Sequence, residues 1–258
     1  MKEKSLVIAQ FSDSHLFAED DGLHHKANVL ENLKRVLASI SADPTIDYIV
    51  FTGDLTQDHS EQSYQNFVDV VKAANICVPL FYLAGNHDEH ILLDQYLFEK
   101  PFVSTKHIDS SDWQIQLINS KSATPAGFVS DKAFTQLDKG MDLRKHQLLM
   151  MHHHPVDVGY FIDKHGLINK GEFWQNIEQH NSCTDSVIAI ACGHVHRASL
   201  IQKHEESSNK SIDVYTCPAT SIQFDPCSDN VCALDQGPAY RLFYLHSNGA
   251  LNTDIVQL

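Results

Sequence analysis

Residues 6–15 read LVIAQFSDSH, a run of mostly apolar residues that ends in the polar cluster Asp13-Ser14-His15. The same arrangement recurs four more times along the chain. Runs at residues 46–51, 79–83, 147–151 and 187–191 precede, in that order, Gly53-Asp54, Gly85-Asn86-His87-Asp88, His152-His153-His154-Pro155 and Gly193-His194-Val195-His196. Short apolar runs separated by helix-like stretches are typical of the buried strands of an α/β sheet. The sequence therefore predicts five strands, each followed by side chains that can bind metal.

These polar clusters are expected to meet, because the carboxyl ends of parallel strands open into a shared crevice. Their Asp, Asn and His side chains combine oxygen and imidazole donors, a mixture that suits Mn, Fe or Zn. Two adjacent ions can generate a strong nucleophile and neutralise phosphoryl oxygens, as phosphoester hydrolysis at neutral pH requires. Asp54 is the candidate carboxylate between two ions, since Gly53 allows the backbone to turn sharply just before it. The pattern indicates a two-metal hydrolase.

Length and composition fit one globular domain over residues 1–258, because 43% of the residues are apolar and 20% are charged. The formal net charge of −14, from 19 basic and 33 acidic residues, disfavours long DNA or RNA as a partner. The apolar runs fall well short of the ~20 residues that span a bilayer. The run at residues 6–11 is also too short for a signal peptide. We therefore expect a cytoplasmic protein with no membrane partner.

The rest of the chain predicts helices outside two sheets. Asn28 and Glu31 have the spacing of a helix-capping pair. Helices are expected over residues 28–40, 60–74, 130–140 and 168–180, with a short one ending near Phe98. Further strands are expected within residues 102–119 and near 199–204, 212–217, 240–246 and 251–257, and loops over 13–26 and 155–166.

The five clusters resemble the D-x-H, GD, GNHD, H and GHxH blocks of the calcineurin-like metallophosphoesterase superfamily, in the same order. The resemblance spans residues 6–258 and implies an α/β fold built as a four-layered αββα sandwich, two mixed sheets flanked by helices. It also implies two divalent or trivalent metal ions, Fe and Mn first and Zn as an alternative. One ion would be held by Asp13, His15, Asp54 and His196, and the other by Asp54, Asn86, His153 and His194.

The sequence does not decide which histidine of residues 152–154 binds the metal. Family members place the ligand two residues before the proline, which gives His153, with His152 as the first alternative and His154 as the other. The resemblance also implies that His87, with Asp54, is catalytic, and that His87 contacts the phosphoryl group and protonates the leaving oxygen.

Other polar residues have less specific roles. Asn86 and His196 are further expected substrate contacts. Asp88 would orient the His87 imidazole or a neighbouring loop. Six histidines have no motif context and are expected to be solvated or structural: His24, His25, His59, His90, His165 and His204.

Two longer stretches, residues 152–167 and 216–249, look like the bacterial 3′,5′-cyclic AMP phosphodiesterases, the class III cyclic-nucleotide phosphodiesterases. This likeness implies that a metal-bridging hydroxide attacks phosphorus in line and opens 3′,5′-cyclic AMP to 5′-AMP. Adenine contacts are not assigned, and Phe161, Phe224 and His154 are candidates only. The alternatives are another small phosphoester, such as a 2′,3′-cyclic nucleotide, a glycerophosphodiester or a nucleotide, and a non-catalytic scaffold, which the complete ligand set disfavours.

Overall fold

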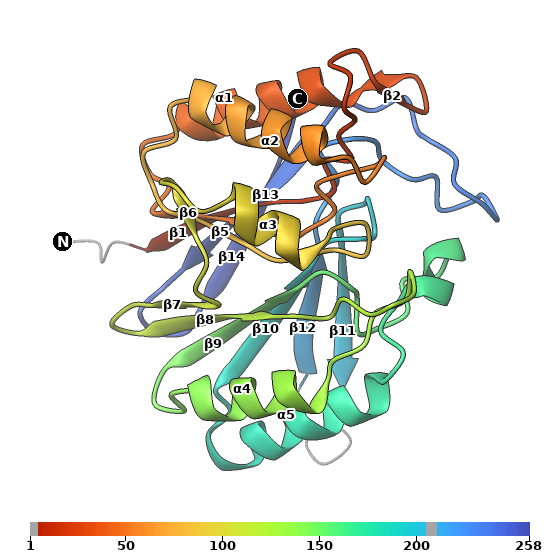
Figure 1. Cartoon of the computed structure of the whole chain (residues 1–258). Helices are drawn as coiled ribbons and strands as arrows, with labels where there is room; N and C mark the ends of the chain where they lie inside the picture. Colours follow the sequence, from red (N-terminus) through yellow and green to blue (C-terminus); the bar gives the residue numbers. More distant parts are fainter. Residues whose placement is uncertain (1–4, 205–210) are drawn as a thin grey trace.

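Two six-stranded mixed sheets lie face to face between layers of helices in the computed structural model, which describes residues 5–204 and 211–258 (Figure 1). The first sheet has the strand order β14-β13-β1-β4-β5-β6 and the second β11-β12-β10-β9-β8-β7. The first sheet consists of β1 (Leu6–Phe11), β4 (Tyr48–Phe51), β5 (Leu80–Tyr82), β6 (Phe102–Val103), β13 (Ala239–Leu245) and β14 (Leu251–Gln257). The second consists of β7 (His107–Asp109), β8 (Trp113–Ile118), β9 (His146–Met151), β10 (Val187–Cys192), β11 (Ser199–His204) and β12 (Ser211–Thr216).

The helices begin close to the residues that the sequence predicts. The Asn28 side chain accepts a hydrogen bond from the Glu31 N–H, and Ser60 caps the next helix through the Ser63 N–H. Such caps satisfy backbone donors that have no partner inside the helix. The helices are α1 (Val29–Ser41), α2 (Glu61–Ala73), α3 (His90–Tyr96), α4 (Asp131–Gly140) and α5 (Lys170–Thr184). None of the helices described is long and apolar enough to cross a membrane.

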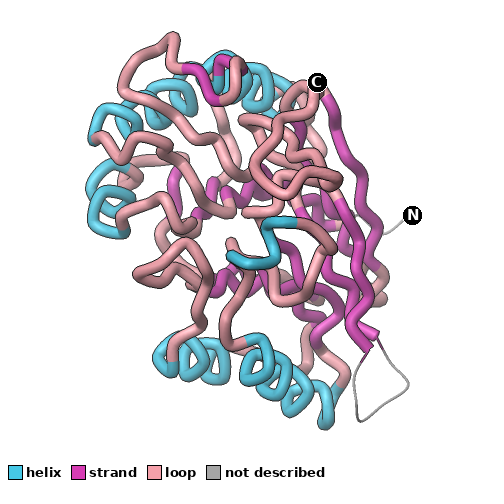
Figure 2. Tube along the Cα trace, turned by 90° about the vertical axis from the view of Figure 1, so that its right-hand side faces the viewer, coloured by secondary structure: helices cyan, strands magenta, loops and turns pink. Residues whose placement is uncertain are grey.

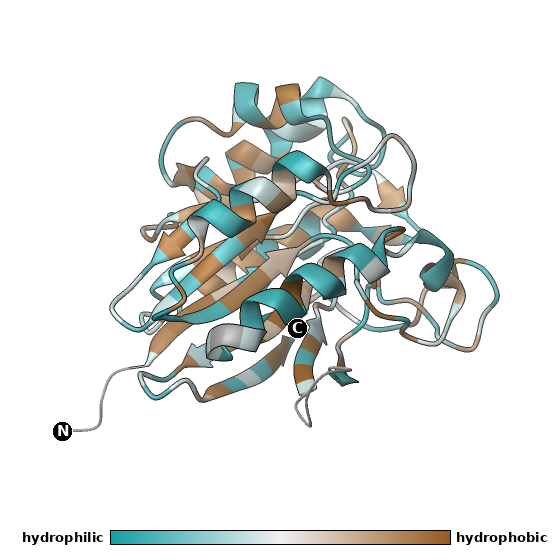
Figure 3. Ribbon diagram, turned by 90° about the horizontal axis from the view of Figure 1, so that it is seen from below, coloured by the Kyte–Doolittle hydropathy of each residue, from teal (hydrophilic) through white to brown (hydrophobic). Residues whose placement is uncertain are grey.

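Among the described residues, the three larger apolar clusters hold these layers together. One core packs α1, α2 and α3 against the first sheet, and another packs α4 and α5 against the second. The third lies between the sheets, where Ile8 and Val50 of one meet Ile115 and Leu148 of the other. In Figure 3 the strands are largely brown, whereas the helix in front of them is largely teal. The predicted four-layered αββα fold is confirmed.

The direction of the strands brings the residues that follow them to one edge of each sheet. β1, β4 and β5 run parallel to one another, and so do β9 and β10, so the carboxyl ends within each set lie at one edge. Figure 2, viewed from the right of Figure 1, shows loops and a short helix between the two helical layers.

The structure differs from the sequence prediction in two loops. Residues 13–26, predicted as a loop, include β2 (Leu23–His24), which pairs with β3 (Ala27–Asn28) in a small hairpin. Its two central residues, His25 and Lys26, have φ angles of 46° and 75°. A two-residue turn with positive φ at both positions usually contains Asn or Gly, so the sequence lacks the usual hairpin signal. Residues 155–166 include a 3₁₀ helix, η1 (Phe161–His165).

Candidate dinuclear metal site

Polar side chains at the carboxyl ends of five strands converge between the two sheets. Asn86 and His87 are half-buried, and the other members of the group are buried. The first sheet supplies Asp13 and His15 after β1, Asp54 after β4, and Asn86 and His87 after β5; the second supplies His152 after β9, and His194 and His196 after β10.

The backbone of this group is unusual, because five of its residues have left-handed φ angles. These are Asp13 (59°), His15 (48°), Asp54 (58°), His194 (67°) and His196 (52°). Non-glycine residues adopt this region at a cost of about 1–3 kcal/mol each, and such outliers gather at functional sites. Backbone hydrogen bonds hold two of the turns together, from the Asp13 N–H to the Gly53 carbonyl (2.9 Å) and from the His15 N–H to the Asp54 carbonyl (3.1 Å).

Two positions in the site require glycine, because neighbouring atoms lie too close to leave room for a Cβ atom. A Cβ atom on Gly85 would lie 2.1 Å from Asp54 Oδ1, and one on Gly193 would lie 2.1 Å from Ser12 Oγ. Real Cβ atoms do not come so near, so a side chain at Gly85 would displace the Asp54 carboxylate. The glycines of the GNHD and GHxH blocks thus make room for the polar residues beside them.

The first cluster of potential ligands joins Asp13, His15 and His196 to Asp54. The Nε2 atoms of His15 and His196 lie 3.1 Å apart, and His196 Nε2 lies 3.4 Å from Asp13 Oδ1. His196 Nδ1 donates to the Ile222 carbonyl at 2.9 Å, which leaves a lone pair on Nε2. His15 Nε2 is 3.6 Å from Asp54 Oδ2.

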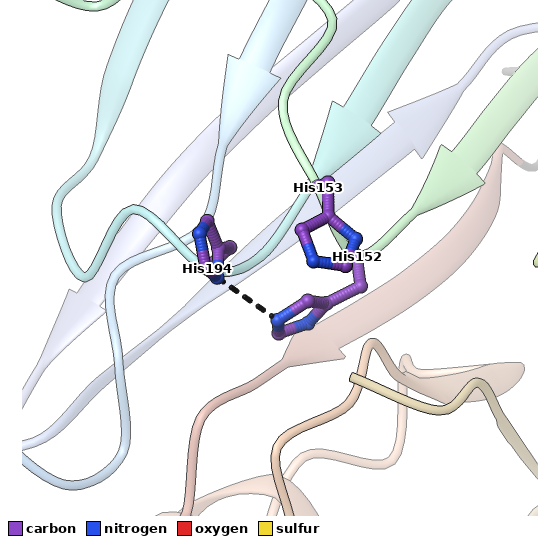
Figure 4. A group of neighbouring side chains, drawn as sticks. All are labelled: His152, His153 and His194. Carbon is purple, nitrogen blue, oxygen red and sulfur yellow. Dashed lines mark hydrogen bonds between the residues drawn. The ribbon is translucent and has the colours of Figure 1, made fainter. Parts of the chain in front are cut away.

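The second cluster joins His152, His194 and Asn86 to the same Asp54 oxygen. His152 Nδ1 donates to the Thr52 carbonyl at 2.7 Å and directs Nε2 into the cluster. His152 Nε2 lies 3.2 Å from His194 Nδ1 (Figure 4). The same nitrogen lies 3.2 Å from Asn86 Oδ1 and 3.4 Å from Asp54 Oδ2. Asp54 Oδ2 therefore lies between two clusters, each of which can surround one ion.

His153 lies beside this second cluster, but both of its ring nitrogens have other partners. Nδ1 contacts Ser120 Oγ at 2.9 Å, and Nε2 donates to the Pro125 carbonyl at 3.2 Å. One ring nitrogen of His153 still lies within 4.8 Å of ligand atoms on His152 and His194. His154 points elsewhere, with Nε2 3.3 Å from Asp163 Oδ1. The geometry favours His152, the first alternative from the sequence, over His153.

The Asp54 carboxylate stabilises positive charge in the site. Burial alone would raise the pKa of Asp54, but the neighbouring His152, His87 and His15 hold it well below its usual range. Burial alone would lower the pKa of His152, but the Asp54 carboxylate raises it to about 9, so this ring must release a proton before Nε2 can bind an ion. Burial lowers the pKa of His15 and of His194, so these rings are neutral and can donate lone pairs. The donor set fits two metal ions.

Asp88 holds the loop that carries Asp54. Its carboxylate accepts hydrogen bonds from the N–H groups of Asp54 (2.8 Å), Leu55 (2.8 Å) and Gly85 (2.9 Å). Burial and the nearby Asp54 charge raise the pKa of Asp88 to about 6. Of the two roles considered from the sequence, the observed contacts match that of fixing a neighbouring loop.

Three residues that contact the site could not be identified from any motif. Lys121 Nζ donates to the Asn86 carbonyl at 3.1 Å. His59 Nδ1 donates to the His87 carbonyl at 2.9 Å, and its ring stacks on His87 with centroids 5.5 Å apart. The His24 ring lies 5.1 Å from His15. Neither histidine belongs to a motif, and only the fold brings them here.

A cavity of about 390 Å³ opens above the two clusters. Asp54, Asn86, His87, His194 and His196 form part of its lining. His24, His25 and His165, for which the sequence offers no motif, also line it. His90 lines another pocket and His204 is exposed on β11.

Two relatives with known names match this chain over nearly its whole length. A probable cyclic nucleotide phosphodiesterase of Colwellia psychrerythraea is 58% identical, over 98% of this chain and 95% of its own length. The 3′,5′-cyclic adenosine monophosphate phosphodiesterase CpdA of Vibrio vulnificus is 32% identical, over 100% of this chain and 92% of its own.

A solved dimetal phosphatase from Danio rerio shares the fold, with a TM-score of 0.66, 11% identity and coverage of 95% and 94% of the two chains. The sequence pattern of the calcineurin-like phosphoesterase family matches residues 6–198. The chain belongs to the calcineurin-like phosphoesterase family.

Proposed function

We propose that this protein is a metal-dependent phosphodiesterase that hydrolyses 3′,5′-cyclic AMP to 5′-AMP. The observation that carries the proposal is the position of Asp54 Oδ2, 3.6 Å from His15 Nε2 and 3.4 Å from His152 Nε2. One carboxylate oxygen between two ligand clusters is the arrangement that a two-metal phosphoesterase needs. The substrate is inferred from relatives named cyclic nucleotide and 3′,5′-cyclic AMP phosphodiesterases.

The proposed ligand sets follow the contacts. Asp13, His15, Asp54 and His196 would hold one ion, and Asp54, Asn86, His152 and His194 the other, with His152 in place of His153. Bound there, two ions would acidify a water molecule and neutralise the oxygens of the phosphoryl group. Fe and Mn are the proposed ions and Zn is the alternative, since the mixed oxygen and imidazole donors accept all three.

The protein's own residues would position the substrate and move a proton. Asp54 Oδ1 accepts a hydrogen bond from the backbone N–H of His87 at 2.9 Å, which fixes the GNHD loop. The other carboxylate oxygen, Oδ2, remains available to the two ligand clusters. The His87 ring lines the cavity, and its Nδ1 is buried without a partner. We assign His87 the transfer of a proton to the 3′ oxygen as it leaves. Asn86 and His196 are the other proposed substrate contacts.

The proposal includes one domain over residues 1–258, because the first sheet joins β1 near the start of the sequence to β13 and β14 near its end. It also includes a cytoplasmic location and a small cyclic nucleotide, not a long nucleic acid, as the substrate. The net charge of −14 supports the last point.

The test is product analysis of the purified protein in Mn²⁺ with 3′,5′-cyclic AMP, 3′,5′-cyclic GMP, 2′,3′-cyclic AMP and an aryl phosphodiester. Asp54→Ala is the control. Conversion of 3′,5′-cyclic AMP to 5′-AMP well above the other rates, and its loss in the variant, is the expected result. Activity confined to the aryl or 2′,3′ diesters would keep the two-metal site and reject the substrate.

A further inference from the structure

The cavity above the two ligand clusters has an outer wall that the phosphoryl chemistry does not use. Three segments distant in sequence form this wall. They are the β2–β3 hairpin with His24 and His25, the η1 helix with Phe161 and Ile162, and the loop that contributes Phe224, Asn230 and Val231. A substrate with its phosphoryl group at the clusters would place its other end against this wall.

Phe161 provides an aromatic surface on the wall. The Phe224 ring, which is only 5% exposed, packs flat on His196 with centroids 4.0 Å apart and planes 2° apart. Phe161 packs against Phe224 at 5.3 Å, lies under Lys164 Nζ at 5.7 Å from its ring centroid, and is a half-buried part of the cavity lining. The aromatic contacts therefore run from a proposed metal ligand to the outer wall.

His24 provides a polar group on the same wall. It belongs to the hairpin whose turn residues, His25 and Lys26, both have positive φ angles. The His24 ring is half-buried, and its Nδ1 is buried and without a hydrogen-bond partner. A buried polar atom without a partner favours a ligand that can supply one.

Asp163 fixes the segment that presents Phe161. Its carboxylate accepts hydrogen bonds from the N–H groups of Val158 (2.7 Å) and Gly159 (2.8 Å), and Oδ1 lies 3.3 Å from Nε2 of the buried His154. The loop after β9 is thereby tied to the same histidine run that supplies the second cluster. Phe161 is held in place instead of being left on a free loop.

We propose that Phe161 and His24 form the subsite for the nucleobase, with Phe161 stacking on the base and His24 bonding to its polar edge. A nucleobase has a flat π face and a hydrogen-bonding edge, and the wall offers a partner for each. This inference rests on the proposed function, since it locates the base of a nucleotide whose phosphate is at the clusters.

The experiment compares Phe161→Leu, Phe161→Tyr and His24→Ala with the wild type, each loaded with Mn²⁺. The matched controls are Phe98→Leu and His107→Ala, which change exposed side chains elsewhere. One readout is binding of 2-aminopurine riboside, whose fluorescence is quenched by stacking and which has no phosphate to hydrolyse. The other is the separate effect on KM and kcat for 3′,5′-cyclic AMP.

We expect Phe161→Leu and His24→Ala each to weaken riboside binding and raise KM by about fivefold or more. The kcat should stay within about twofold, and Phe161→Tyr and the controls should behave like the wild type. Unchanged riboside binding and KM in both variants would reject the subsite. A wild type that binds the riboside but does not hydrolyse 3′,5′-cyclic AMP would retain the subsite and reject the proposed function.

Discussion

The Asp88 carboxylate accepts a hydrogen bond from the backbone N–H of Asp54 at 2.8 Å, so one buried acid positions another. In Asp88→Asn the side chain has one accepting oxygen, and its NH₂ group would face N–H donors. We expect a 10–100-fold loss of activity or metal affinity, as for other residues that support metal ligands. Thermal unfolding should also show a loss of about 1–3 kcal/mol. Asp69→Asn, on the exposed side of α2, is the control and should change neither value.

The histidine run gives a sharper test of the proposed ligands. His152→Ala should remove one of the two ions and lower kcat/KM by at least about 100-fold, because Nε2 of His152 points into the second cluster. His153→Ala should keep both ions, because its ring nitrogens contact Ser120 and Pro125. The metal content of the two variants, measured by mass spectrometry, decides which histidine is the ligand. Loss of an ion in His153→Ala would restore His153 as the ligand.

Replacing His87 should lower the turnover number without changing the number of bound metal ions. Its side chain lines the cavity but is absent from both proposed ligand sets. We expect His87→Ala to lower kcat by about 10²–10⁴-fold, the usual contribution of a general acid, while two ions remain bound. Kinetics and metal analysis on the same preparation test this, and normal turnover would reject the role.

Gly85→Ala tests how tightly the site is packed. The added Cβ would lie 2.1 Å from Asp54 Oδ1 and 2.4 Å from Asp54 N, so the carboxylate must move. We expect a stability loss of about 1–3 kcal/mol together with loss of activity. Gly171→Ala, at a position in α5 with nothing within 4 Å of the new atom, is the matched control. It should alter the unfolding free energy by less than about 1 kcal/mol and leave activity unchanged.

Asp163 should make the free energy of unfolding depend on pH in the acid range. Burial would raise its pKa, but the nearby His154 side chain and hydrogen bonds from the Val158 and Gly159 N–H groups lower it to about 2. An unfolded Asp has a pKa of about 3.9, so the stabilisation is complete well above that value and is lost as the pH falls toward 2. Denaturant unfolding of wild type and Asp163→Asn should show a constant difference from pH 7 to about 5 that narrows below about 4. A difference that stays constant down to pH 3 would contradict the assignment.

The strands that carry the site could be predicted because each combines an apolar run with polar residues directly after it. Helix starts were also readable, since Asn28 and Ser60 cap their helices through local contacts. The choice within the histidine run was not readable, because it depends on where β9 ends and on the position of the Thr52 carbonyl, about 100 residues away in sequence. Contacts of His59 with His87 and of His24 with His15 likewise depend on turns whose residues have no characteristic pattern.

The interior position of β1 has a consequence for synthesis on the ribosome. Leu6 pairs with Leu245 of β13 on one side, while Ile8 pairs with Tyr48 of β4 on the other. A nascent chain can therefore join β1 to β4 early, but the opposite edge of β1 stays unpaired until β13 has emerged. An open edge of this kind is a template for aggregation. The nascent chain carries that hazard through most of its translation, and so would any product of premature termination.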